Sequence, residues 1–428
     1  MVYIMGWRWV SLILILVLLA GCGSPSIISD PKKVQTLQDR DKTVITFWHT
    51  YNDKETQLLE QRLIPAFEQE NSNIRVETIN LAFNNELKNT LIARASSNRG
   101  PDVVRIDIAW VPEFSLKGLL EPLNGFTDFE DIRNRFNPKA MDVGFYKNEY
   151  YSLPLNIYTK AAIFNRELLE QAGYSKPPST MKEVLEIARQ HRFTIGLGGL
   201  EPWNTIPYLY SLGGTLTDKK FHKASGYLNG EGTIHAVEQL TALYKEKLID
   251  LPKKAGDGKN LERVKAGNTL LTDDGPWFYS LLNKTELDRT LKRTIPVSFP
   301  HGNGSASIIG GENMVIMKGS KHPDEAWTFM KWMTGKEAQL IMAQTGLIPT
   351  NLEAAKAFKV TPNSYLNPFM EPAENSFQWP PVKNWSKIDK VYTDYLNRIF
   401  AGELSVKDGL DRAAAEIDVL LADSDSNQ

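Results

Sequence analysis

The first third of the chain alternates short strands with helices, and this alternation restricts the fold more than any other feature of the sequence. Strands are expected at 43–48 (TVITFW), at 74–79 and within 100–107 (GPDVVRID), with helices between them at about 54–70 and 85–96. Strand, helix, strand, helix and strand at this spacing favour parallel strands joined by right-handed crossovers. We therefore predict an α/β fold.

The first of these helices carries its own prediction. Leu59, Leu63 and Phe67 recur every fourth residue and form one apolar face. Pro65 lies inside the same segment. Because proline has no amide hydrogen and its ring clashes with the preceding turn, it should kink or split this helix.

Similar patterns place the later elements. Thr180 and Glu183 form a T-x-x-E capping box that opens a helix at 181–190, and Thr334 and Glu337 repeat this pattern. Residues 150–173 are expected to form an extended crossing, then a strand and a helix. The remaining predictions are a strand at 307–317 (SIIGGENMVIM), a helix starting at Pro323, and helices at 234–246, 386–400 and 405–421.

The N-terminus indicates export. Ten of the eleven residues from Val10 to Ala20 are apolar, too few to span a bilayer, which takes roughly 20. With Arg8 before it and small residues after it, the run is typical of a secretory signal peptide at 1–21. Cys22 follows Leu19-Ala20-Gly21, and this arrangement resembles the bacterial lipobox, in which the cysteine is acylated with a chain such as palmitate. The alternative is an ordinary signal or tail helix with an incidental cysteine.

Composition limits the class of protein. Residues 22–41 have few apolar positions and are expected to be a tether that spans about 25 Å, and the rest is long enough for two domains. Cys22 is the only cysteine, which excludes disulfides from the mature fold. A net charge of −2 provides no field for nucleic acid. Scattered histidines and missing phosphate-loop, H-E-x-x-H and G-x-S-x-G motifs predict no metal, no cofactor and no catalytic residues.

Six stretches together carry a family resemblance. They are ITFWHTYND, IPAFEQENSNIRVE, GPDVVRIDIAWVPEFSLKGLLEPL, YSLPLNIYTKAAIFNRELLEQAG, LLTDDGPW and GGENMVIMKGSKHPDEAWTFMKWMTGKEAQ, in this order over most of residues 43–350. Behind a lipobox, they resemble the sugar-binding lipoproteins of bacterial ABC importers, the group that includes maltose-binding protein. Residues 360–428 match this group only loosely.

The resemblance implies a two-lobed periplasmic-binding-protein fold of type II, with a mostly parallel, helix-flanked sheet in each lobe and hinge strands between them. The implied first lobe is 42–153 plus 308–358, and the implied second lobe is 154–307 plus 359–425. The implied partners are a carbohydrate, bound between the lobes and released unaltered, and the permease subunits of the importer. A monomer at the extracytoplasmic face of the cell membrane is expected.

Strand ends give the first candidate ligand contacts. Ligands of open α/β sheets bind outside the carboxyl ends of the strands. Trp48 and His49 end the first predicted strand, while Asp107 and Trp110 end the third and begin its helix. Aromatic faces can stack on a sugar ring, and carboxylates can accept hydrogen bonds from its hydroxyls. The alternatives are core packing for Trp48, helix capping for Asp107 and a loop hydrogen bond for His49. Burial of Trp110 is not expected before a helix.

Later loops give the other candidates. The DDGPW segment (273–277) resembles the family segment that places a tryptophan in the cleft, which makes Trp277 a ligand residue and Asp274 either a contact or a turn residue. Trp203 lies in a proline-flanked stretch that we predict to be a loop, and Trp379 in FQWPP either covers the cleft or anchors the structure. The remaining candidates are Tyr158 (contact or hinge packing), Gly311 (close ligand approach, or else a bulge or a hinge) and Glu312.

Three other functions stay open. A sensor lipoprotein would present its ligand to a membrane kinase, and a relative of this fold could bind a solute other than a sugar. A glycosidase would need two carboxylates, for which Asp107 and Asp274 are the least implausible pair.

Overall fold

The computed structural model describes residues 42–252, 259–301, 306–370 and 376–425. The chain divides into two units between residues 41 and 42. The predicted signal peptide, the tether and Cys22 all belong to the first unit and lie outside the described residues.

The first sheet of the second unit has six strands. Its order is β13-β12-β3-β1-β2, with β6 also paired to β12. β1 is parallel to both β2 and β3, which confirms the parallel arrangement predicted from the strand–helix alternation. Its strands are β1 (Thr43–His49), β2 (Ile74–Asn80), β3 (Val103–Asp107), β6 (Leu153–Thr159), β12 (Ser307–Ile316) and β13 (Ser376–Phe377).

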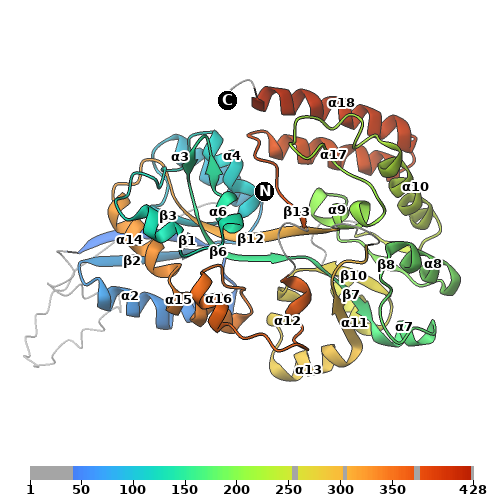
Figure 1. The fold of residues 1–428 in the computed structure, drawn as a ribbon, viewed down its shortest axis with the longest axis horizontal. Coiled ribbons are helices and arrows are strands. Elements are labelled where there is room, and N and C mark those ends of the chain that lie inside the picture. The colour runs from blue at the N-terminus through green and yellow to red at the C-terminus, as the bar shows by residue number, and fades with distance from the viewer. Residues whose placement is uncertain (1–41, 253–258, 302–305, 371–375, 426–428) are drawn as a thin grey trace, which may run out of the picture. The chain divides into compact units, whose positions relative to one another are not determined.

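Helices cover both faces of this sheet (Figure 1). Phe47 packs into the core on one face, whereas its neighbour Trp48 packs into the core on the other, as the period of two in a strand requires. The elements are α1 (Asp53–Leu58), the π-helical η2 (Leu59–Leu63), α2 (Ile64–Glu70), α3 (Asn85–Ser96), the 3₁₀ turn η3 (Ile108–Trp110), α4 (Val111–Leu116), α5 (Phe129–Arg133), α6 (Pro138–Asp142), the hairpin β4 (Phe145–Tyr146) and β5 (Glu149–Tyr150), α14 (Pro323–Met333), α15 (Lys336–Met342), η4 (Ala343–Thr345) and α16 (Leu352–Ala357).

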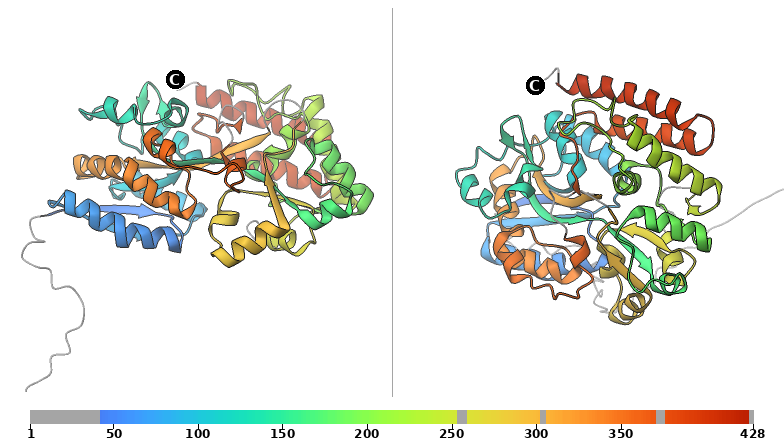
Figure 2. Two further views of the ribbon diagram at one scale, coloured as in Figure 1. Left: turned by 60° about the horizontal axis from the view of Figure 1, so that its bottom comes forward. Right: turned by 45° about the vertical axis from the view of Figure 1, so that its right-hand side comes forward.

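The second sheet has five strands in the order β11-β7-β10-β8-β9. Its strands are β7 (Ala161–Asn165), β8 (Ile195–Gly196), β9 (Ile249–Asp250), β10 (Leu271–Asp274) and β11 (Thr294–Val297). Its helices are α7 (Arg166–Gln171), α8 (Met181–His191), α9 (Pro202–Ser211), α10 (Glu231–Lys245), α11 (Lys259–Ala266), α12 (Trp277–Ser280), α13 (Lys284–Arg293), α17 (Trp385–Phe400) and α18 (Val406–Asp425), with the 3₁₀ turn η5 (Asn367–Phe369) beside β11. Figure 2 shows α17 and α18 side by side, and α18 packs on α10.

Two strands carry the chain between the sheets. Only Lys160 separates β6 from β7. Residues 154–159 belong to β6 and pair with β12 in the first sheet. β12 pairs with β13 at Ser307–Ile308, with β6 from Ile309 onward, and with β3 up to Ile316. Figure 1 shows β6 and β12 running together across the middle of this unit. The residue boundaries of the two lobes stay predictions.

The pairing pattern of each sheet is mixed. In the first sheet β12 runs antiparallel to β3 and β6, and in the second sheet β7 runs antiparallel to β10 and β11. The remaining pairs in both sheets are parallel. β12 runs from the second sheet back to the first and is therefore opposite in direction to β6, which leaves the first sheet.

Three local predictions can be compared with the structure. The helix around Pro65 is split as predicted, with a π-helical segment at Leu59–Leu63 just before the proline. Thr180 caps α8 by accepting a hydrogen bond from the Glu183 amide, also as predicted. The second capping box is wrong: Gly335 precedes α15, and the Thr334 hydroxyl donates back to the Met330 carbonyl at the end of α14.

Gly311 tests how tightly the crossing strands fit. Its φ is +151°, and a Cβ atom there would lie 2.3 Å from the Asn156 carbonyl oxygen. We expect Gly311→Ala to lower the free energy of unfolding by about 2 kcal/mol or more, because strain and overpacking add. Gly125→Ala is the matched control, since a Cβ there meets nothing within 4 Å. Equal urea midpoints for the two variants would contradict the close fit.

Candidate functional site

Two carboxyl groups face each other at the end of the first sheet. Asp107 ends β3 and accepts a hydrogen bond from the Ala109 amide at 2.7 Å, which caps the turn η3. Glu312 is its register partner on β12. The Glu312 carboxylate accepts a hydrogen bond of 2.6 Å from the Asn156 side chain and forms an ion pair of 3.0 Å with Arg105. The capping alternative for Asp107 is therefore realised, and its contact with a ligand stays a prediction.

Burial shifts the pKa values of Asp107 and His49 at this end of the sheet. Burial and the nearby Glu312 carboxylate raise the pKa of Asp107 to about 7. Burial, together with the positive charge of Arg105, lowers the pKa of His49 to about 4. His49 is therefore a neutral imidazole at physiological pH, and its Nε2 has no hydrogen-bond partner in the described part of the chain.

The three other first-sheet candidates are buried. His49 is 1% exposed and packs between the rings of Phe47 and Tyr51. Trp48 is 9% exposed, with the Arg94 guanidinium 5.1 Å from its ring centre. Trp110 is 8% exposed, which corrects the expectation that it would not be buried.

Trp110 is buried because an aromatic partner covers it. The exposed Phe83 ring stacks on it at 5.1 Å with an angle of 10° between the planes. The ligand contacts predicted for Trp48, His49 and Trp110 stay predictions.

The second group of candidates forms one aromatic row: Tyr158, Trp277, Trp203 and Trp379. Tyr158 meets Trp277 edge to face at 5.2 Å. Trp203 lies between the other two tryptophans, 6.4 Å from each, with nearly parallel rings. All three tryptophans are partly exposed. Residues more than 200 positions apart in the sequence thus belong to one row of ring contacts. Their contact with a ligand stays a prediction.

Local structure fixes each ring of the row. Trp203 lies in the first turn of α9, after Pro202, which corrects the predicted loop, since proline is well suited to the first helical position. Trp379 donates its indole hydrogen to the Ile309 carbonyl at 2.8 Å. The Trp277 ring lies on Gly275, where a Cβ would be 2.2 Å from it.

Lys160, which lies between β6 and β7, contacts the aromatic row at Trp203. It is 1% exposed, and its ammonium group contacts the Asp273 carboxylate. It also donates to the Trp203 carbonyl at 3.0 Å and lies 4.7 Å from the centre of the Trp203 ring. Tyr208 donates to the other oxygen of Asp273 at 2.9 Å.

Tyr158 joins the two groups of candidates. Burial raises its pKa well above the ordinary value, and the carboxylates of Glu312, Asp107 and Asp274 act in the same direction. Carboxyl groups from both sheets therefore lie close enough to act on one phenol. Burial also raises the pKa of Asp274 to about 7, and its side chain accepts from the Gly275 amide at 2.8 Å.

Polar contacts also link the helices of the two sheets. The Lys54 ammonium group of α1 donates to the carbonyls of Leu281 and Leu282, just after α12, at 2.9 and 3.0 Å. On α17, the Ser386 hydroxyl lies within hydrogen-bond distance of Glu113 and Lys88, which themselves form a buried ion pair of 2.8 Å.

Gly310 and Gly311 serve strand packing in the described structure. A Cβ at Gly310 would lie 2.4 Å from the Tyr158 ring, and the pairing of β12 with β6 is irregular between Glu312 and Asn313. Gly310 and Gly311 themselves pair in regular register with Tyr158 and Ile157, so both glycines serve the close approach of the two strands. A ligand contact at Gly311 stays a prediction.

Sequence analysis missed the residues that hold the candidates in place: Lys160, Asp273, Arg105 and Asn156. Lys160 interrupts the apolar stretch YTKAAIF, and Arg105 interrupts VVRID. A single charge inside a buried strand must be paired, so both positions could have been flagged, although their partners could not.

The described residues contain no group of three or more histidine, cysteine, aspartate or glutamate side chains arranged to hold a metal ion. No helix among them has the length and apolar character needed to cross a membrane.

The raised pKa values give a test of burial. A carboxyl group whose pKa is about 7 in the fold and 3.8 when unfolded destabilises the protein increasingly as pH rises between these values. Asp107→Asn and Asp274→Asn should therefore raise the unfolding temperature more at pH 8 than at pH 5. Asp288→Asn is the control, because Asp288 forms an exposed pair with Lys284. A gain that is the same at both pH values would contradict the burial of these carboxyls.

Residues 62–366 match the family described as bacterial extracellular solute-binding protein. A binding protein of Brucella abortus is 24% identical over 379 residues, covering 83% of this chain and 90% of its own. The maltotriose-binding protein of Pyrococcus abyssi is 22% identical, covering 69% and 64%.

Solved structures share the fold over nearly the whole described chain. The GacH receptor of Streptomyces glaucescens, solved unliganded and with acarbose, superposes with a TM-score of 0.78 at 26% identity, over 89% of this chain and 99% of the receptor. Maltose-bound MalE3 of T. maritima gives 0.75 at 21%, over 88% and 99%. The fold is thus the two-lobed one predicted, and the chain belongs to the bacterial extracellular solute-binding proteins, which work outside the cytoplasm.

Proposed function

We propose that this chain is the membrane-anchored binding protein of an ABC importer, that it captures a carbohydrate between its two lobes and that it delivers the sugar to the permease. The aromatic row carries the proposal. In this row the partly exposed Trp277 meets Tyr158, and the partly exposed Trp203 lies between Trp277 and Trp379. The carboxylates of Glu312, Asp107 and Asp274 all raise the pKa of Tyr158. The lobes proposed are 42–153 plus 308–358 and 154–307 plus 359–425.

This combination suits a hydroxylated ring. Aromatic faces contribute about 0.5–1.5 kcal/mol beyond the buried area, and a hydrogen bond to a charged group contributes about 1.5–3 kcal/mol. Two of each give roughly 4–9 kcal/mol before entropy costs. A micromolar ligand needs about 8 kcal/mol, an affinity that still allows release to a transporter.

The relatives support a carbohydrate ligand. One is a maltotriose-binding protein, and solved neighbours hold acarbose, maltose and α-D-tagatose. The aromatic row has three indoles in succession. Among these ligands, a row of this length favours an oligosaccharide over a monosaccharide. Maltotriose is therefore the first ligand to test, and a thermal-shift screen of a sugar library extends the search.

Lobe closure is the proposed mechanism. Lys54 and Ser386 each contact the helices of the other sheet, so these hydrogen bonds depend on the lobes being close together. A ligand that touches both lobes would favour this arrangement, because only there are all its contacts made. The permease would then bind the closed form of a monomer.

A glycosidase and a sensor are the competing functions. Asp107 and Asp274 both have a pKa near 7, a property shared by the general acids of glycosidases. The relatives are binding proteins, so we propose that the sugar leaves intact. Chromatography of maltotriose after incubation tests this point, and permease or kinase genes beside the gene would separate import from sensing.

Trp277→Ala tests the aromatic row. Loss of the indole should weaken maltotriose binding by about 30-fold, the effect of a hot-spot aromatic residue, without unfolding the protein. Trp332→Ala is the matched control, since Trp332 is also partly buried but lies on α14 with its indole bonded to Glu70. Isothermal titration calorimetry should show the loss in the first variant only. Equal affinities in the two variants would remove Trp277 from the ligand site.

Cys22→Ala tests the anchor. Cys22 lies outside the described residues, so the proposal rests on its position after Leu19-Ala20-Gly21. Without the thiol no acyl chain can be attached, and the protein should move from the membrane fraction to the soluble fraction with unchanged sugar affinity. Ser24→Ala is the control. A Cys22→Ala protein that still sediments with membranes would contradict the lipobox.

A further inference from the structure

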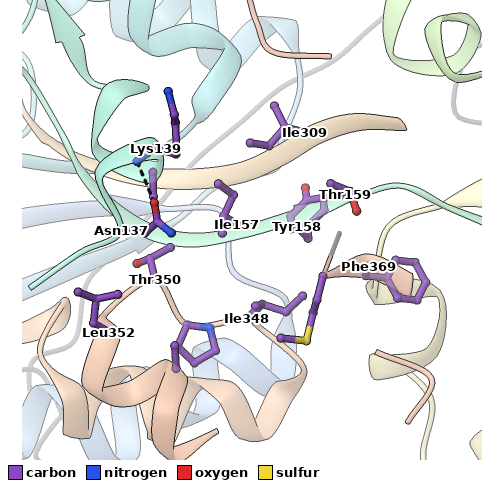
Figure 3. A pocket seen from close by; sticks show the side chains of 14 residues that line it. Asn137, Lys139, Ile157, Tyr158, Thr159, Ile309, Ile348, Thr350, Leu352 and Phe369 are labelled. Atoms are coloured by element: carbon purple, nitrogen blue, oxygen red, sulfur yellow. Dashed lines mark hydrogen bonds between the residues drawn. The ribbon is translucent and has the colours of Figure 1, made fainter. Parts of the chain in front are cut away.

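A cavity of about 310 Å³ lies beside the strand β6, away from most of the predicted sugar contacts. Figure 3 shows it between β6 and the segment that carries Ile348 and Thr350, with Phe369 at one end. Tyr158 is the only member of the aromatic row among its lining residues. We infer that this cavity is a second binding site, for a small, mainly apolar molecule that carries one hydrogen-bonding group.

The walls of the cavity define the apolar part of this ligand. Ile309, Ile348 and Phe369 line it, and each is at most 6% exposed. Pro349 and Ile157 extend the same apolar wall. Binding sites for small molecules have this composition, mainly apolar with a few polar groups that fix orientation.

Thr159 defines the polar part. Its side chain lines the cavity and is 2% exposed, yet its hydroxyl has no hydrogen-bond partner in the described part of the chain. Two other polar groups in the wall have partners: the Thr350 hydroxyl donates to the Pro154 carbonyl, and the Asn137 side-chain oxygen caps α6. A buried hydroxyl without a partner is unfavourable, and a ligand hydroxyl or carbonyl at this position would satisfy it.

The position of the cavity couples it to lobe closure. Asn137 and Leu352 belong to elements of the first sheet. Phe369 belongs to a cluster with Ile163 and Tyr279 of the second sheet. Because the chain changes sheets at Lys160, next to Thr159, a movement of the lobes must change the spacing across the cavity. A ligand that fits one spacing shifts the population of lobe arrangements. This coupling rests on the proposed function, whereas the site itself does not.

The first experiment measures binding alone, without sugar. The probe is 2-naphthalenemethanol, a flat apolar body with one hydroxyl, and 2-methylnaphthalene is the same body without it. Fluorescence titration of the mature chain should show saturable binding of both. Thr159→Val keeps the shape of the side chain and removes its hydroxyl, so it should weaken the alcohol about tenfold and leave the hydrocarbon unchanged.

A blocking variant locates the probe. Ala355 is an exposed residue of α16 that lines the cavity, and Ala357, also exposed on this helix, does not line it. Ala355→Trp should abolish binding of the probe, whereas Ala357→Trp should bind as the parent does. No saturable binding to the parent chain, or binding that survives Ala355→Trp, would overturn the site.

The second experiment measures the coupling. Maltotriose affinity should change by the same factor when 2-naphthalenemethanol saturates the protein as the probe affinity changes when maltotriose does, since linkage is reciprocal. The coupling would be overturned if the probe binds in the cavity that Ala355→Trp blocks but neither ligand changes the affinity of the other. Failure of maltotriose to bind at all would instead contradict the proposed function, and the probe titrations distinguish the two results.

Discussion

The antiparallel pairing of β6 with β12 is the constraint on which the rest of the structure depends. These strands carry the chain between two sheets, and they approach so closely that Gly310 lies against the Tyr158 ring and Gly311 against the Asn156 carbonyl. Side chains at either glycine would separate the strands. The close pairing therefore fixes Tyr158 against β12 at the point where the chain passes from one sheet to the other.

Buried charges then set the geometry around the crossing. Lys160 and Asp273 form one buried pair, and Arg105 and Glu312 form another. Removing a charge from water is costly, so such pairs persist only with good geometry and further hydrogen bonds. Here those bonds reach the Trp203 backbone and Asn156. The pairs thus hold the Trp203 backbone and the Glu312 carboxylate in place.

Local patterns were enough to predict most elements, whereas Trp277 was proposed from the family resemblance of its segment. The spacing of apolar residues indicated the first three strands and their helices, and the strained position of Pro65 indicated the split after α1. The predicted residues Tyr158, Trp203, Trp277 and Trp379 do form one group. The prediction of helix starts failed where one residue fits two local patterns. Thr334 has the sequence of a helix start, but its hydroxyl bonds back to the end of the preceding helix.

By itself, the sequence determined the α/β class and the parallel order of the first strands, because these follow from periodicity and residue type along short segments. Only the tertiary structure decided which rings face one another and which charges are paired, since the partners are far apart in the sequence. Trp110 shows the difference: its place after β3 was predictable, but its burial under Phe83 depends on a loop folding over it. Lys160 was visible as an isolated charge, yet its partner Asp273 is brought to it only by the pairing of β7 with β10.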